Sequence, residues 1–201
     1  MEISPRYLAA VRYAATAHAT QVRKKTTAPY LSHLLGVSSL VLEAEGSEMA
    51  AIAALLHDAA EDQPLGKRGG EGRLDDIRDE FGVEIADMVR ALSDFISTSI
   101  NEVKDTNSYV ERKLAYQKKL TNIDNQGVLL VSVADKLHNA RAMETDAAMI
   151  GEELWERFRG GKQDIIENFE SLLAIYERPQ NSSGVHRLAK QLRATVTRLA
   201  A

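Results

Sequence analysis

Apolar residues recur along most of the chain at every third or fourth position, which is the period of an amphipathic helix. The first such segment follows Ser4 and Pro5, a capping residue and a proline that open a helix expected to reach about Thr20. We find no alternating strand pattern, no repeat of fixed period and no glycine-rich phosphate loop. The pattern predicts an all-α fold, a compact multi-helix bundle with no significant sheet.

Glycine and proline residues divide the chain into further predicted helices. The helix expected at residues 48–62 is rich in alanine and leucine and apolar on most faces, so it should be central. Residues 63–73 contain four glycines and a proline and are expected to form a loop. A polar connection at residues 97–107 precedes a predicted helix with Tyr109, Leu114, Tyr116 and Leu120 on its apolar side. A short helix is expected to end at residues 81–82. The other predicted helices span residues 30–45, 83–96, 128–143, 150–159 and 163–178.

The end of the chain differs from the rest. We expect one main domain at residues 1–178, followed at 179–201 by a linker and a basic C-terminal helix at 186–201. A solvated face explains its basic residues most simply, but packing on the body, contact between copies and an acidic partner are alternatives. These basic residues are Arg187, Lys190, Arg193 and Arg198.

Composition restricts the chemistry. The 201 residues include no cysteine, which excludes thiolate metal sites and cysteine nucleophiles, so any metal must have nitrogen and oxygen ligands. A net charge of −4 gives no positive field for duplex nucleic acid. The longest apolar runs, at residues 50–56 and 128–134, are too short for a bilayer, and the N-terminus has no signal-peptide pattern. We therefore expect a cytoplasmic protein that binds neither duplex nucleic acid nor membrane.

The segment LLHDAAED, residues 55–62, carries the main chemical signal. On a helix, Glu61 shares a face with His57, and Asp62 shares a face with Asp58. Three carboxylates beside an imidazole would raise one another's pKa unless a cation lies among them. A charged final turn of an exposed helix is the simpler explanation, but His57 directly follows apolar residues. The pattern therefore favours a divalent metal.

A second signal is Asp135, which directly follows the apolar run VLLVSVA. Burying its carboxylate is costly unless it binds a metal or pairs with a cation such as Lys136 or Arg141. Asn139 lies one turn later on the same face. With His33 from an earlier helix, a candidate ligand set from three helices emerges, suited to manganese, iron, zinc or magnesium with open positions for water. Its members are His33, His57, Asp58 and Asp135.

The order His, His-Asp, Asp resembles that of the HD phosphohydrolase superfamily. The likeness is closer to the hydrolase domain of RelA/SpoT-type enzymes and small alarmone hydrolases, which cleave (p)ppGpp. It rests on residues 18–37 and LLHDAAED, and on FGVEIADMVRALSD, YVERKLAYQKKL and VADKLHNARAM in the same order, and it covers about residues 5–145.

This resemblance implies that His33, His57, Asp58 and Asp135 bind a divalent metal, normally Mn²⁺ in the family. It implies further roles for seven residues: Glu61 and Asp62 as the catalytic acid/base pair, Arg23, Lys24 and Asn139 near the nucleotide, and Arg112 and Lys113 near phosphate. The expected reaction is the removal of pyrophosphate from the 3′ position of (p)ppGpp, a guanosine tetra- or pentaphosphate, by a metal-activated water.

Three alternatives remain open at this point. In the first, the protein is a hydrolase of the same type that acts on another nucleotide or phosphoester. In the second, it is a regulatory module that binds a nucleotide without appreciable catalysis. In the third, it is a structural helical domain that binds no metal. The complete ligand set and the Glu61–Asp62 pair favour the hydrolase. The basic loop at residues 63–73 is either a lid over phosphates or a solvated loop, and the oligomeric state is left open.

Overall fold

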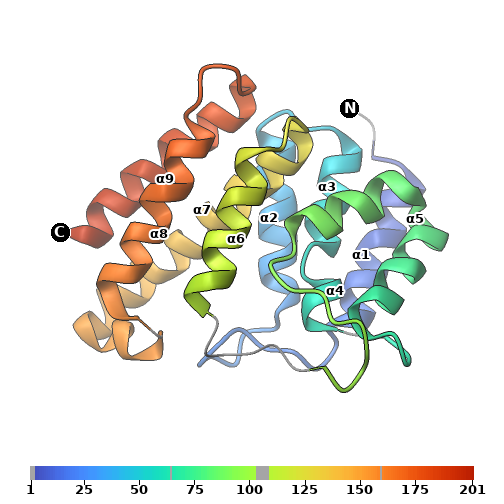
Figure 1. Cartoon of the computed structure of the whole chain (residues 1–201). Coiled ribbons are helices and arrows are strands. Elements are labelled where there is room, and N and C mark those ends of the chain that lie inside the picture. The colour runs from blue at the N-terminus through green and yellow to red at the C-terminus, as the bar shows by residue number, and fades with distance from the viewer. Residues whose placement is uncertain (1–2, 64, 103–108, 159) are drawn as a thin grey trace.

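The computed structural model describes residues 3–63, 65–102, 109–158 and 160–201, and all regular elements in these ranges are helices (Figure 1). One isolated antiparallel bridge joins Val22 and Pro29. The predicted all-α fold is confirmed. The elements are α1 (Pro5–Ala17), α2 (Leu31–Glu43), α3 (Glu48–Leu56), α4 (Ala59–Asp62), α5 (Gly69–Leu92), α6 (Tyr109–Thr121), α7 (Gln126–Ile150), the 3₁₀ helix η1 (Gly151–Arg157), α8 (Gly161–Tyr176) and α9 (Ser183–Ala200).

Helix α3 lies at the centre of the fold, as its composition predicts. Ser47 caps it by accepting a hydrogen bond from the Ala50 amide, and residues 50–56 are each at most 1% exposed. Their small side chains allow α1, α2, α5 and α7 to pack closely around it. A helix that is apolar on all faces is stable only when it is enclosed in this way.

Helix α7 is the second long axis of the molecule, and it contacts α2, α3, α5, α8, η1 and α9. Its buried residues belong to a core shared with α8 and α9, while a second core lies among α1, α3 and α5. In Figure 1, α1, α3 and α5 form one end of the molecule and α8 and α9 the other. Helices α2 and α7 lie between these two ends, and each carries residues of the site described below.

The predicted single helix at residues 48–62 is wrong in one respect, because it breaks at His57 and Asp58. Helix α3 ends at Leu56, and a turn at His57 and Asp58, whose backbone angles stay in the right-handed helical region, separates it from α4. Adjacent side chains on a continuous helix would point about 100° apart. At this turn both side chains reach one site, where His57 Nε2 lies 3.0 Å from Asp58 Oδ2.

The predicted loop at residues 63–73 is also shorter than expected, because α5 begins at Gly69. Gly70 packs so closely on α4 that a Cβ there would lie 2.6 Å from the Ala60 carbonyl oxygen. These glycines thus permit close packing rather than marking only a loop. Helix α5 includes the short predicted helix before Gly82 and the one predicted at 83–96 as far as Leu92, where α5 ends, and φ of 79° at Gly82 interrupts its helical backbone.

Two further boundaries differ from prediction. Helix α7 continues to Ile150, where Gly151 with φ of 59° ends it, and the next segment is a 3₁₀ helix. The predicted end at Arg159 and the connection at residues 103–108 lie outside the described residues. On α6, Tyr116 and Leu120 are buried as expected, but Leu114 is 57% exposed, because α8 covers only part of this face.

The basic C-terminal helix packs on the body of the protein. Helix α9 starts at Ser183, three residues before the predicted start, and buries an apolar face against α7 and α8. Arg193 forms ion pairs with Glu170 and Glu177 of α8 and its C-cap, and Arg198 pairs with Glu144 of α7. The solvated-face interpretation therefore applies only to the outer side of α9, and the domain boundary at residue 178 stays a prediction.

No helix in the described part of the chain combines the length and apolar character needed to cross a membrane.

Candidate metal centre and active site

Four side chains from three parts of the chain converge at one point. His33 comes from α2, His57 and Asp58 from the break between α3 and α4, and Asp135 from α7. The Nε2 atom of His33 lies 3.2 Å from Asp135 Oδ1 and 3.8 Å from Asp58 Oδ2. The Nε2 atom of His57 lies 3.0 Å from Asp58 Oδ2 and 3.8 Å from Asp135 Oδ1. The structure thus brings together the four residues that the sequence indicates.

These spacings fit a metal ion. Ligand atoms about 2.1 Å from a metal are separated by about 3.0 Å in an octahedron and about 3.4 Å in a tetrahedron. The four distances in the cluster range from 3.0 to 3.8 Å. His33, His57 and Asp58 form a group whose ligand atoms all lie within 4.8 Å of one another. We therefore assign a divalent-metal centre to this position.

His57 supplies an independent test of that fit. Its Nδ1 atom lies 2.8 Å from the Ala54 carbonyl oxygen, so Nδ1 carries the hydrogen and donates it. The Nε2 atom can then bind a proton or a metal: it is buried, makes no hydrogen bond of good geometry, and lies 3.0 Å from Asp58 Oδ2. Burial acts to lower the pKa of His57, but the carboxylates of Asp58 and Asp135 raise it well above its usual range. A cation, either a proton or a metal, is required beside this nitrogen.

His33 is positioned by a second histidine. Its Nδ1 atom lies 3.0 Å from Nδ1 of His138, one helical turn after Asp135 on α7. A Cβ on Gly36 would lie 2.2 Å from the His138 ring, so glycine at this position makes room for the imidazole. Burial and the neighbouring His33 lower the pKa of His138 to about 4, which keeps it a neutral acceptor. His33 then donates from Nδ1 and turns Nε2 towards the carboxylates.

The two carboxylates are also held by neighbouring donors. The Tyr30 hydroxyl donates to Asp58 Oδ2 at 2.5 Å, while Lys136 Nζ and Asn139 Nδ2 each lie 2.6 Å from an oxygen of Asp135. Burial acts to raise the pKa of Asp135, but Lys136 and the histidines hold it well below its usual range. Both carboxylates are therefore ionised and oriented as ligands.

The two acidic residues of α4, Glu61 and Asp62, lie in different environments. Glu61 lines a polar cavity of about 160 Å³ that contains His57, Asp58 and Asp135, and its carboxylate accepts a hydrogen bond from the Asp94 amide. Asp62 is exposed and accepts a hydrogen bond from Gln21 at 2.9 Å. Gln21 in turn contacts His18 and Gln63. Only Glu61 of this pair lines the cavity at the metal ligands.

A larger cavity of about 550 Å³ adjoins the polar one and shares Tyr30, Lys113, Lys136 and Asn139 with it. Its volume is in the range of small-molecule sites. Arg23 and Lys24 line it, and Arg23 donates to Asn139 at 3.0 Å. Its apolar wall consists of Ala142, Met143, Phe158, Ile165 and Phe169.

The remaining predicted residues are placed as follows. Lys113 lines both cavities and forms an ion pair with Asp94 at 2.7 Å. Arg112 lines neither cavity, and its predicted contact with phosphate stays a prediction. In the basic segment at residues 63–73, Arg68 pairs with Asp75 and Arg73 contacts the Tyr13 hydroxyl. Both arginines therefore face α5 and α1 rather than the cavities.

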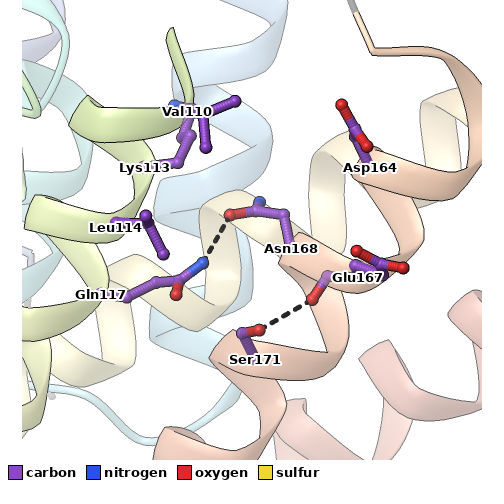
Figure 2. A pocket seen from close by; sticks show the side chains of 8 residues that line it. All are labelled: Val110, Lys113, Leu114, Gln117, Asp164, Glu167, Asn168 and Ser171. Carbon is purple, nitrogen blue, oxygen red and sulfur yellow. Dashed lines mark hydrogen bonds between the residues drawn. The ribbon is translucent and has the colours of Figure 1, made fainter. Parts of the chain in front are cut away.

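A third hollow of about 170 Å³ lies between α6 and α8. Figure 2 shows Gln117 of α6 donating to Asn168 of α8 across it, at 3.0 Å. Lys113 and Asn168 line both this hollow and the large cavity. Of the predicted site residues, it contains only Lys113.

Sequence reasoning missed Tyr30 and His138 as parts of the site and weighed Lys136 only as an ion-pair partner of Asp135. One signal was available for His138, because it lies three residues after Asp135 and so on the same side of a helix. Tyr30 carries no such signal, since its contact with Asp58 depends on how α2 and α3 pack.

Fold and site together define a class: all-helical proteins in which histidines and aspartates from separate helices form a divalent-metal centre. A family model described as an HD domain matches residues 10–165, and the chain belongs to this HD domain family.

Comparison with individual proteins agrees with this assignment. GTP pyrophosphokinase rsh of Brucella ovis is 31% identical over 176 residues, which are 83% of this chain and 22% of the relative. A Synechocystis protein named as a probable guanosine-3′,5′-bis(diphosphate) 3′-pyrophosphohydrolase is 29% identical over 162 residues, 79% of this chain and 19% of its own. The chain thus spans about a fifth of the length of these curated relatives.

Two solved structures match most of the chain. A metazoan ortholog of SpoT, described as hydrolysing ppGpp, superimposes with a TM-score of 0.68 at 22% identity and covers 96% of this chain and 97% of its own. The protein lmo0812 of Listeria monocytogenes gives a TM-score of 0.67 at 25% identity, covering 84% of this chain and 98% of its own. The likeness to the SpoT ortholog shows a shared fold.

Proposed function

We propose that the protein is a metal-dependent phosphohydrolase that removes pyrophosphate from the 3′ position of (p)ppGpp. The observation that carries this proposal is the position of the converging ligands: His57, Asp58 and Asp135 line a polar cavity, with His33 behind them, and that cavity adjoins a larger, cation-lined one. The two cavities together suit a ligand with a highly charged end and an aromatic end. We further propose Mn²⁺ as the metal.

A divalent metal in this centre would stabilise negative charge on the phosphoryl group and lower the pKa of the attacking water. Glu61 lines the same cavity as the ligands, so we assign it the acceptance of the proton from that water. Asp62 is held by Gln21 at the outer end of α4, and we assign it a supporting role in protonating the leaving group. Water adds to phosphorus, the bond between phosphorus and the 3′ oxygen breaks, and GDP or GTP and pyrophosphate result.

Cationic side chains surround the expected path of the phosphates. Lys136 and Lys113 stand where the two cavities meet, and Arg23 and Lys24 line the larger one. Burial acts to lower the pKa of Lys136, but Asp135 raises it well above its usual range, so Lys136 carries a charge at neutral pH. These charges neutralise the phosphates in the ground state and the transition state.

The apolar wall of the larger cavity suits a sugar and a base. Met143, Phe158 and Phe169 supply flat or flexible apolar surface, and Asn139 lies between that wall and the metal ligands. Asn139 has both donor and acceptor atoms for a ribose hydroxyl. The name of the Synechocystis relative supports this choice of substrate.

The direct test is hydrolysis of ppGpp by the purified protein with Mn²⁺, beside a panel of other nucleotides and phosphoesters and a chelator control. The proposal predicts one pyrophosphate and one GDP per ppGpp consumed, and no release with the chelator. Cleavage of another nucleotide but not ppGpp would retain the chemistry and replace the substrate. If the protein binds metal but hydrolyses no compound of the panel, the result would instead favour a regulatory module that binds a nucleotide without catalysis.

A further inference from the structure

The large cavity contains one acidic side chain among the described residues that line it. That side chain is Asp146 of α7, and it shares the cavity with five cationic ones: Arg23, Lys24, Lys113, Lys136 and Arg157. A cavity so rich in cations attracts phosphate, and a carboxylate in it repels phosphate. Asp146 is therefore better suited to a part of the ligand that is not a phosphate.

Its place along α7 indicates which part that is. Residues 135, 139 and 146 lie on one face of the helix, since steps of seven and eleven residues are close to whole turns. Asp135 is at the metal centre, Asn139 is in both cavities, and Asp146 is about 10 Å beyond Asn139 at 1.5 Å per residue. Ala142 and Met143 line the cavity between them. A nucleotide with phosphate at the metal would place its base near Asp146.

Asp146 is held in position by Arg157 of η1, whose Nη1 atom lies 2.9 Å from Asp146 Oδ2. A carboxylate accepts about four hydrogen bonds, and this ion pair uses part of that capacity. The pair thus fixes the carboxylate at the cavity wall while acceptor positions remain for ligand donors.

We propose that Asp146 selects guanine, an inference that rests on the proposed function of this site. The guanine edge presents N1–H and the N2 amino group side by side, and both donate to a single carboxylate. Adenine presents one amino donor beside the N1 acceptor, which the carboxylate repels. Arg157 acts by holding Asp146 in place.

The sharpest test is Asp146→Asn, because an amide presents one acceptor and one donor. That pair matches xanthine, which has N1–H beside a carbonyl oxygen. We would measure kcat/KM for the 3′,5′-bis(diphosphates) of guanosine, xanthosine and adenosine, and the Kd of GDP, XDP and ADP by calorimetry. Asp79→Asn, an exposed residue of α5, is the matched control.

We expect the wild-type protein and Asp79→Asn to prefer guanine over adenine and over xanthine by about 10- to 100-fold. Asp146→Asn should reverse the preference between guanine and xanthine. Arg157→Ala should weaken binding of all nucleotides, because the Asp146 side chain is no longer held, but keep the preference for guanine over adenine, because the carboxylate itself is still present.

An unchanged ratio of guanine to xanthine in Asp146→Asn would overturn the inference. An equal loss on all nucleotides in both Asp146→Asn and Arg157→Ala would also overturn it, because the ion pair would then be only structural. If no nucleotide is hydrolysed but GDP and XDP binding still switch with Asp146→Asn, the proposed function fails and the base selection stands. If ppGpp is hydrolysed but the protein shows no preference among bases, the proposed function stands and the base selection fails.

Discussion

At the scale of single residues, each metal-ligand candidate is held in orientation by at least one neighbouring group. His57 donates from Nδ1 to the Ala54 carbonyl, and His33 lies against His138. Asp58 accepts from Tyr30, and Asp135 is held by two donors of α7. These contacts set the tautomer of both imidazoles and leave the same nitrogen, Nε2, facing the carboxylates.

The contact between His33 and His138 leads to a prediction. Replacing His138 with Leu removes the acceptor for the His33 N–H, so we expect the metal affinity to fall about 10- to 100-fold, as for other outer-shell contacts. His138→Asn should restore most of the affinity, because its carbonyl oxygen can take the place of Nδ1. Isothermal titration with Mn²⁺ measures both, and equal affinities for wild type and His138→Leu would show that His138 does not position the ligand.

The residue scale also shows what the sequence can and cannot reveal. His57 and Asp135 stand out because each directly follows an apolar run, where burial without a partner is costly, and Asp58 stands out as the neighbour of His57. His33 stands out only through the order of motifs. The neighbours that orient them carry ordinary residue types, and their contacts depend on packing between distant helices.

At the scale of elements, the break between α3 and α4 matters most for the site. A continuous helix was expected here, and helical periodicity alone cannot indicate the break, because good helix formers flank it on both sides, alanine and leucine before it and alanine after it. The start of α5 at Gly69 was missed for a related reason. Glycines usually indicate loops, but here they allow α5 to approach α4.

Helix α9 was expected as an appendage, yet its apolar face belongs to the same core as α7 and α8. We therefore expect Leu192→Ala, at a fully buried position, to lower the free energy of unfolding by about 2–5 kcal/mol. Leu114→Ala, at a position 57% exposed, makes the same chemical change and should cost about 0.5 kcal/mol or less. Urea denaturation of the two variants measures the difference, and similar values for both would show that α9 contributes little to the core.

At the scale of the whole molecule, the centre lies between the two cores. Helix α2 and the break after α3 supply ligands from one side, and α7 supplies Asp135 from the other. The sequence predicts the all-α class and indicates the four residues that the structure brings together, because period and order are local properties of the chain. It does not predict the two joined cavities, since their walls come from helices distant in the sequence.

Because the ligands come from separate helices, metal binding should stabilise the whole fold. An ion that binds only the folded state at 100 times its Kd adds about 2.7 kcal/mol to the free energy of unfolding. We expect the melting temperature to rise with Mn²⁺ and to return to the metal-free value with a chelator. A melting temperature that does not respond to Mn²⁺, Fe²⁺, Zn²⁺ or Mg²⁺ would argue against a centre that joins these helices.

The metal content of wild-type protein and of Asp58→Asn, measured by mass spectrometry after loading with Mn²⁺, tests the central claim most directly. Asn keeps the size of the side chain but removes the charge that faces His57, so the fold should persist, as circular dichroism would verify. We predict one ion per wild-type chain, little or none in Asp58→Asn, and loss of phosphohydrolase activity in proportion. An Asp58→Asn protein that retained one ion and wild-type turnover would contradict the assignment of this cluster as the metal centre.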